Sequence, residues 1–328
     1  MMARQARLDA PGTLHHIIIR GIEQKKIVDD GYDRKDFVSR MGKIASETET
    51  PIYAWALMTN HAHILLRSGP SGLSRYMLRF LSGYAGSFNR RHHRHGHLFQ
   101  NRYKSIVCEE DRYFRELVRY IHLNPLRAKL IESFAQLDRY RWCGHSVLMG
   151  KIKNDWQDRD YVLKWFGAKG GEAKRAYRQF VKEGIEQGRR PDLVGGGLIR
   201  SQGGWAPVKA MRRLGVREKS DERILGSGEF VEQLLRQSDK SRKEHFSALQ
   251  LSQKAAALVG QVCKEQNLRV DTLKSGSRRR NVSRVREQLV QELVEGLGLS
   301  LAETGRHLGV SLSAVAKSLS RRDKNKSN

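Results

Sequence analysis

The sequence contains few cysteines, and those it has are scattered. Cys108, Cys143 and Cys263 are odd in number and show no CxxC spacing. This argues against a disulfide framework and against a zinc site built from thiolates. We therefore expect the chain to work in a reducing, cytoplasmic compartment.

Long apolar runs are also missing. The sequence has no stretch of about eighteen apolar residues, so no segment is expected to span a bilayer. The first residues, 1–7, lack the apolar core of a signal peptide. Both absences agree with a cytoplasmic location.

Acidic residues are too few to balance the basic ones. Lys and Arg number 61 against 35 Asp and Glu, giving a formal net charge of +26 over 328 residues. Such an excess favours a polyanionic partner, and nucleic acid is the default. No long amphipathic basic helix concentrates the charge, so a membrane surface is a weaker candidate. We expect a nucleoid-associated chain that is long enough for more than one domain.

The first 130 residues alternate strand-like and helix-like patterns. Apolar and β-branched stretches predict strands at residues 14–20, 52–58, 61–66 and 103–108. Helical periodicity falls between them, at 30–50 and 73–88. This order predicts an α+β domain, a ferredoxin-like antiparallel sheet with helices on one face.

The third predicted strand carries two histidines, His61 and His63. Side chains two residues apart in a strand project from the same face of the sheet. Two imidazoles on one face form half of a divalent-metal site. Histidines that serve only packing have the same spacing and are the alternative.

A helix with an acidic start is predicted over 111–121, after the fourth strand. Its apolar residues follow the pattern of a core-facing stripe. Tyr120 and Asn124 lie four residues apart and so share one helical face. Pro125 places Asn124 near a helix end or kink. Taken alone, Tyr120 as core filler and Asn124 as a cap would explain both residues without any function.

The combination of these motifs resembles the single-tyrosine HUH transposases, and in more detail their REP-associated tyrosine transposase (RAYT) branch. Three stretches carry the resemblance: Asn-His-x-His within 58–66, Gly-His-Leu-Phe-Gln-Asn-Arg-Tyr-Lys-Ser at 96–105, and Arg-Tyr-Ile-His-Leu-Asn-Pro-Leu-Arg-Ala at 119–128. They occur in the family's order and at its spacing. Together they cover the first predicted domain, residues 1–130.

The resemblance implies a metal-dependent enzyme that acts on single-stranded or hairpin DNA. In such an enzyme His61, His63 and Asn124 would hold Mg²⁺ or Mn²⁺, and Tyr120 would attack phosphorus to form a 5′-phosphotyrosine link. Some relatives have Gln at the third-ligand position, where this chain has the shorter Asn. Members of the wider family act as homodimers.

Further DNA contacts are expected next to the fourth strand. Arg102, Tyr103 and Lys104 place cations on both sides of an aromatic ring, which suits stacking on an unpaired base. Just before them, residues 92–97 hold four histidines mixed with arginine. This loop-like spacing disfavours joint metal ligation, so we expect phosphate contacts there instead.

The rest of the chain is predicted to be mostly helical. Residues 131–236 read as a helical extension of the catalytic domain, and residues 237–274 as a linker and a helix. Residues 275–328 resemble the C-terminal DNA-binding domain of the replication initiator DnaA. Ser300–Glu303 is a capping box, and residues 309–311 form a turn between two short helices, the helix-turn-helix shape.

If this domain binds duplex DNA, six side chains are its candidate contacts. They are Arg278, Arg279, Arg280, Ser311, Ser313 and Lys317. A three-helix unit that serves only packing is the alternative.

These observations predict a transposase-type strand transferase that nicks and rejoins DNA through Tyr120, with duplex binding by the C-terminal domain. A non-catalytic DNA-binding regulator of repeat sequences is the alternative from another class. A metal-dependent nuclease that uses water is a third. Only the first forms a covalent adduct between protein and DNA.

Overall fold

The computed structural model describes residues 8–9, 11–188, 190–213, 218–244 and 248–325. The chain divides into two units, Met1–Asp239 and Lys240–Asn328, and each has buried apolar clusters of its own. Among the described residues, no helix has the length and apolar character that crossing a membrane requires.

The first unit is built on a five-stranded sheet with the order β2-β3-β1-β4-β5. Its strands are β1 (Leu14–Arg20), β2 (Ile52–Leu57), β3 (His61–Arg67), β4 (Lys104–Cys108) and β5 (Ile224–Leu225). The first four pair antiparallel in the predicted ferredoxin-like order, which confirms the α+β class. β5 pairs with β4 in parallel, so the sheet is mixed and the extension is not wholly helical.

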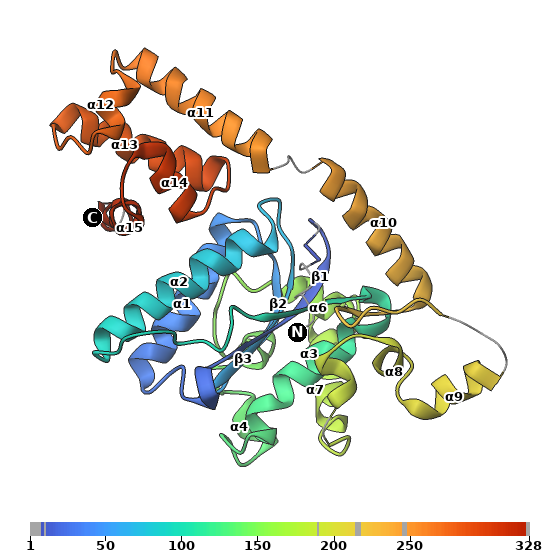
Figure 1. The fold of residues 1–328 in the computed structure, drawn as a ribbon. Helices are drawn as coiled ribbons and strands as arrows, with labels where there is room; N and C mark the ends of the chain where they lie inside the picture. Colours follow the sequence, from blue (N-terminus) through green and yellow to red (C-terminus); the bar gives the residue numbers. More distant parts are fainter. Residues whose placement is uncertain (1–7, 10, 189, 214–217, 245–247, 326–328) are drawn as a thin grey trace. The chain divides into compact units, whose positions relative to one another are not determined.

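Helices cover both faces of the sheet, which corrects the prediction of one covered face. α1 (Gly31–Glu47) and α2 (Leu73–Arg91) lie side by side over one face (Figure 1). α3 (Glu110–Arg127) packs on the other face. β2 is buried at every position and β1 at all but the last. Strands buried on both sides need a cover on each face, so their apolar side chains do not alternate with polar ones.

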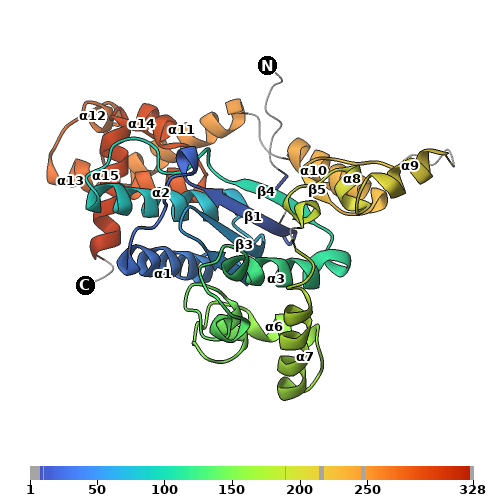
Figure 2. The same cartoon turned by 90° about the horizontal axis from the view of Figure 1, so that it is seen from below.

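The extension completes the core on the α3 face. Its helices are α4 (Phe134–Leu137), α5 (His145–Leu148), α6 (Arg159–Lys164), α7 (Gly170–Glu183), η2 (Pro191–Val194), α8 (Leu198–Ser201), α9 (Trp205–Arg213) and α10 (Gly228–Glu244). Buried side chains such as Leu137, Leu163 and Tyr177 join the apolar cluster beneath α3. Figure 2 shows α6 and α7 on the same side of the sheet as α3.

The second unit is a helical bundle. Its elements are α11 (Ala248–Glu265), α12 (Val270–Lys274), α13 (Arg280–Gln291) with a π-helical turn (Glu292–Gly296), α14 (Leu301–Leu308) and α15 (Leu312–Asn325). α11 and α12 contribute buried residues to its core, so this unit begins before the predicted boundary at residue 275. Residues 237–244, predicted to open a linker, instead form the end of α10. A polar composition suits either a linker or a helix, so composition could not decide between them.

The predicted capping box at the start of α14 is confirmed. The Ser300 hydroxyl accepts from the Glu303 N–H at 3.2 Å, and the Glu303 carboxylate accepts from the Ser300 N–H at 3.0 Å. Gly309 ends the helix in the left-handed conformation, with φ of 66°. A Cβ at Gly309 would lie 2.3 Å from the backbone oxygen of Lys274. The turn between α14 and α15 therefore requires glycine.

Gly309→Ala should destabilise the second unit by about 2–4 kcal/mol. The left-handed backbone strains an alanine, and its Cβ would also collide with the main chain of Lys274, which is less free to move than a side chain. Gly276→Ala is the matched control: φ is also positive (+74°), but no atom lies within 4 Å of its Cβ position. The control should cost only about 1–2 kcal/mol. Thermal unfolding followed by circular dichroism measures both losses, and equal losses would contradict the collision.

Candidate active site

A row of polar side chains gathers at one end of β1 and β3, on the face that α3 covers. In the antiparallel register, Arg20 lies opposite His61 and Ile18 lies opposite His63. Because alternate residues of a strand share a face, His16 points the same way as Ile18. The ring centroids of His61 and His63 are 5.4 Å apart. The His-x-His spacing thus places both imidazoles on one face, as expected.

α3 brings Tyr120 against these histidines. The Tyr120 ring centroid lies 5.6 Å from that of His63 and 5.9 Å from that of His16, edge to face in both pairs. One turn further on, Asn124 is half-buried, and its amide nitrogen donates to the Tyr120 carbonyl at 2.9 Å. Two segments far apart in the sequence therefore place the phenol beside His63 and His16, with Asn124 one helical turn from Tyr120.

The hydrogen bonds of the two histidines leave the same nitrogen open on each. His61 Nδ1 lies 2.7 Å from Asn60 Oδ1, while the Asn60 amide nitrogen donates to the Gln24 carbonyl at 3.2 Å. That second bond orients the amide so that its oxygen accepts from His61. His63 Nδ1 lies 2.8 Å from His16 Nε2. Each Nδ1 is thus engaged, and neither Nε2 has a hydrogen-bond partner in the part of the chain that the structure describes.

Burial keeps these imidazoles neutral. Desolvation, together with a smaller effect of the nearby charge of Arg20, lowers the pKa of His61 to about 4. Desolvation also lowers the pKa of His63 well below its usual range, with smaller effects from His16 and His61. The pKa of His16 is lowered to about 4, again chiefly by burial. A neutral imidazole keeps a lone pair, which is the form that binds a metal ion.

The donor set fits a divalent ion such as Mn²⁺ or Mg²⁺. A metal-binding histidine usually has its second ring nitrogen held by another group, as both histidines do here. No group of three His, Cys, Asp or Glu side chains gathers in the part of the chain that the structure describes. The remaining ligands would therefore be oxygens from Asn124, water and DNA, which suit these two ions.

Arg127 is a cation beside the phenol that the sequence analysis did not single out. Its guanidinium carbon lies 5.6 Å from the centroid of the Tyr120 ring, and its Nη2 donates to the Gly184 carbonyl at 3.1 Å. Its Nε and Nη1 are buried without a hydrogen-bond partner among the described residues. Burial raises the pKa of Tyr120, whereas Arg127, Arg20 and a hydrogen bond from Asn124 lower it.

The extension reaches the site through η2. The Leu193 carbonyl lies 3.0 Å from His16 Nδ1, and the Val194 carbonyl accepts from Lys104 Nζ at 2.6 Å. Leu193 and Val194, well beyond the Tyr-x-x-x-Asn motif, therefore contact side chains of β1 and β4. Motif spacing could not show this, because η2 contributes main-chain carbonyls.

Of the three predicted single-strand contacts next to β4, two lie at the surface and one lies in the core. Arg102 and Lys104 are exposed, whereas Tyr103 is only 7% exposed and packs in the core beneath α2. The prediction that its ring stacks on a base is therefore wrong. Side chains alternate in direction along an extended chain, so the two cations point outward and the ring between them points inward.

The histidine-rich loop after α2 is tied to α1 at its start. Arg91 pairs with Asp30, and both Arg91 and His92 contact Asp33, at 2.7 and 2.9 Å. Further along, residues 95–97 are exposed. Among the described residues, the ion pairs with these carboxylates thus involve only the start of the loop.

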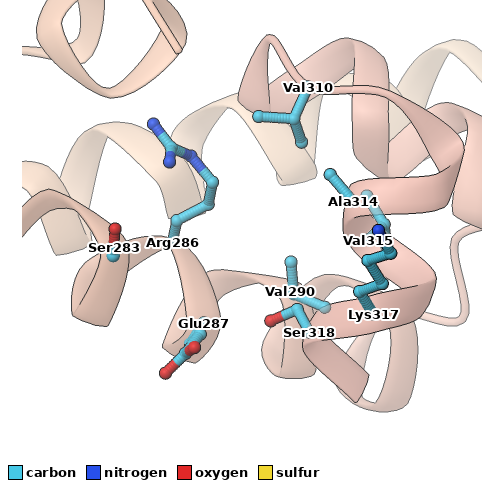
Figure 3. A pocket seen from close by; sticks show the side chains of 9 residues that line it. All are labelled: Ser283, Arg286, Glu287, Val290, Val310, Ala314, Val315, Lys317 and Ser318. Carbon is cyan, nitrogen blue, oxygen red and sulfur yellow. The ribbon is translucent and has the colours of Figure 1, made fainter. Parts of the chain in front are cut away.

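The predicted duplex contacts all lie at the surface of the second unit. Arg278–Arg280, Ser311 and Ser313 are exposed. Lys317 is exposed as well and lines a shallow pocket of about 210 Å³ between α13 and α15, with Arg286 on the α13 side (Figure 3). A short helix, a three-residue turn and an exposed second helix are thus present.

Part of the chain matches a known protein family. Residues 12–124, from the segment before β1 to Asn124 on α3, match a family model described as "Transposase IS200 like". This stretch contains both histidines and Tyr120. Residues 12–124 are therefore similar to the IS200-like transposases, in agreement with the resemblance that the motifs of this stretch indicated.

The chain was also compared with curated proteins and with solved structures. No curated protein matches the chain. One matching solved structure is described as "Structure of the REP associates tyrosine transposase bound to a REP hairpin". It is 13% identical, the match covers 48% of this chain and 94% of that chain, and the TM-score is 0.39.

Proposed function

We propose that the chain is a metal-dependent transposase that nicks and rejoins single-stranded or hairpin DNA through Tyr120. The observation that carries the proposal is the 5.6 Å separation between the rings of Tyr120 and His63, on the sheet face that also holds His61. A phenol beside two neutral imidazoles suits metal-assisted phosphoryl transfer. The family match over residues 12–124 supports the same reaction class.

In the proposed reaction the Tyr120 oxygen attacks the phosphorus of a DNA phosphodiester. A bond forms between that oxygen and phosphorus while the bond from phosphorus to the 3′-oxygen breaks. The phenol loses its proton, and the leaving oxygen gains one to become a 3′-hydroxyl. The 5′-phosphate stays on Tyr120. Attack by a 3′-hydroxyl reverses the step, so rejoining needs no nucleotide cofactor.

The surrounding residues have separate roles in this proposal. His61, His63 and Asn124 would hold the divalent ion, which when bound neutralises the non-bridging phosphate oxygens and orients the phosphate. Arg127 lies beside the phenol and favours its ionised form, since its charge lowers the pKa of Tyr120. Burial raises the pKa of Tyr120, and the charge of Arg127 acts against that rise.

We also propose that the second unit binds duplex DNA. The exposed face of α15, the preceding three-residue turn and the arginines at 278–280 support this, because a helix presented in this way can enter the major groove while cations contact the backbone. The net charge of +26 favours the same partner.

Replacing Arg278, Arg279 and Arg280 together with Gln should weaken duplex binding and make it less sensitive to salt. If each arginine contacts one phosphate, the slope of log affinity against log salt falls in magnitude by about 2.7, since each contact contributes about 0.9. Fluorescence anisotropy of a labelled random-sequence duplex, repeated at several salt concentrations, measures the slope.

The matched control removes the same charge from the same unit. Lys254, Lys264 and Arg269 are exposed on α11 and the loop that follows it. Replacing these three with Gln should change the slope by less than the arginine triple does. An unchanged slope in the arginine triple, or an equal change in the control, would contradict duplex binding through residues 278–280.

A further inference from the structure

We propose that His16 is a positioning residue of the metal site, which fixes the tautomer of His63 through hydrogen bonds anchored on the Leu193 carbonyl. The inference rests on the proposed function and adds to it a residue of β1 and a carbonyl of the extension. It makes η2 part of the site rather than a neighbouring element.

His16 is held on both sides. Its side chain is fully buried, with 0% exposure. Its Nδ1 lies 3.0 Å from the Leu193 oxygen, and its Nε2 lies 2.8 Å from His63 Nδ1. The two rings have centroids 5.1 Å apart and planes inclined by 28°. Both nitrogens of His16 therefore have fixed partners.

The Leu193 carbonyl determines which atom donates in each of these two hydrogen bonds. A carbonyl oxygen can only accept, so His16 Nδ1 carries the proton and donates. Neutral His16 then has its lone pair at Nε2, and His63 Nδ1 must donate to it. His63 Nε2 is left with a lone pair, the form that binds a metal ion.

Two simpler roles do not account for His16. It is not placed as a metal ligand, because neither of its nitrogens is open. It is not explained by packing, because an apolar side chain of similar size would leave the Leu193 carbonyl and the His63 N–H buried without these partners.

The two metal-site histidines are held in the same way by different parts of the chain. His61 is oriented by Asn60, its neighbour in sequence. His63 is oriented by His16, from β1, and through it by η2. A partner this far away in sequence couples the metal site to the folding of the extension.

Mn²⁺ binding to the full chain without DNA tests the inference, with free Mn²⁺ followed by electron paramagnetic resonance. His16→Leu should weaken Mn²⁺ affinity about 10- to 100-fold, the usual effect of losing such a partner. His16→Gln should keep the affinity within about threefold, because a carboxamide can accept from His63 and donate to Leu193.

His15→Leu is the matched control. His15 is the preceding residue of β1 and equally buried, but it faces the other side of the sheet and bonds to Thr13 and Ser105 at 2.7 and 2.9 Å. Its loss should leave Mn²⁺ affinity unchanged. This control distinguishes an effect on Mn²⁺ affinity that is specific to His16 from the loss of stability caused by removing any buried histidine of β1.

Three outcomes of the binding experiment would overturn the inference. The first is an unchanged Mn²⁺ affinity in folded His16→Leu. The second is a loss of Mn²⁺ affinity in His16→Gln as large as that in His16→Leu, which would mean that the shape of the imidazole ring matters and its hydrogen bonds do not. A wild-type chain that binds no Mn²⁺ would overturn the proposed metal site together with this inference. If His16→Leu does not fold, two-bond ¹H–¹⁵N spectra of the wild-type imidazoles decide: we expect a proton on His63 Nδ1, and a proton on Nε2 contradicts us.

Discussion

Tyr120→Phe should abolish the covalent adduct between protein and DNA, with a loss of about a thousandfold or more, because it removes the nucleophile. The ring that packs against His63 and His16 remains, so the fold and the histidine pair should be kept. The assay incubates the protein with Mn²⁺ and hairpin-forming strands with randomised flanks, then denatures it. The label sits at the 3′ end, because the fragment with the 5′-phosphate stays on tyrosine.

Tyr113→Phe makes the same change on the same helix. The Tyr113 hydroxyl donates to the Ser201 carbonyl at 2.8 Å, toward α8. The adduct should persist in this variant, with a stability loss of about 1 kcal/mol for the hydrogen bond. Cutting by Tyr120→Phe without an adduct would identify a nuclease that uses water. A wild-type chain that never forms an adduct would favour the DNA-binding regulator.

Replacing His61 and His63 together with Ala should lower adduct formation at least about a hundredfold, because losing ligands costs more than the 10- to 100-fold expected from losing a partner of a ligand. Removing the metal with EDTA should have the same effect on the wild-type chain and little further effect on the variant. Mn²⁺ affinity and adduct yield are measured on the same preparations.

His95→Ala with His97→Ala is the control for this pair. These two histidines have the same spacing of two residues and are exposed on the loop after α2. Their removal should leave Mn²⁺ affinity and adduct yield close to those of the wild type. If this control loses metal while the His61 and His63 variant keeps it, the metal site lies in the loop and the proposed site is wrong.

Local patterns predicted the parts of the fold that local physics governs. The two-residue period of a strand placed His61 and His63 on one face, and the capping residues marked the start of α14. The side of the sheet on which α3 packs could not be predicted in this way. β1 and β2 place buried apolar residues on both faces, so their sequences do not distinguish the side that α1 and α2 cover from the side that α3 covers.

The residues that sequence reasoning missed depend on contacts between distant segments. His15 and His16 are adjacent in β1, and only the pairing of β1 with β3 shows that the second one meets His63. Leu193 contributes a main-chain carbonyl, which no motif of side chains records. Tyr103 was misread because its neighbouring cations indicated a surface, whereas its own ring belongs to the core.

The most direct test of the account is to identify the residue that carries the DNA. Trypsin should release residues 120–127 as one peptide, because arginines lie at 119 and 127, and Tyr120 is its only tyrosine. Mass spectrometry of the nuclease-trimmed adduct should find a 5′-linked nucleotide on this peptide, at Tyr120. A nucleotide on any other peptide would contradict the proposal that the phenol beside His63 is the nucleophile.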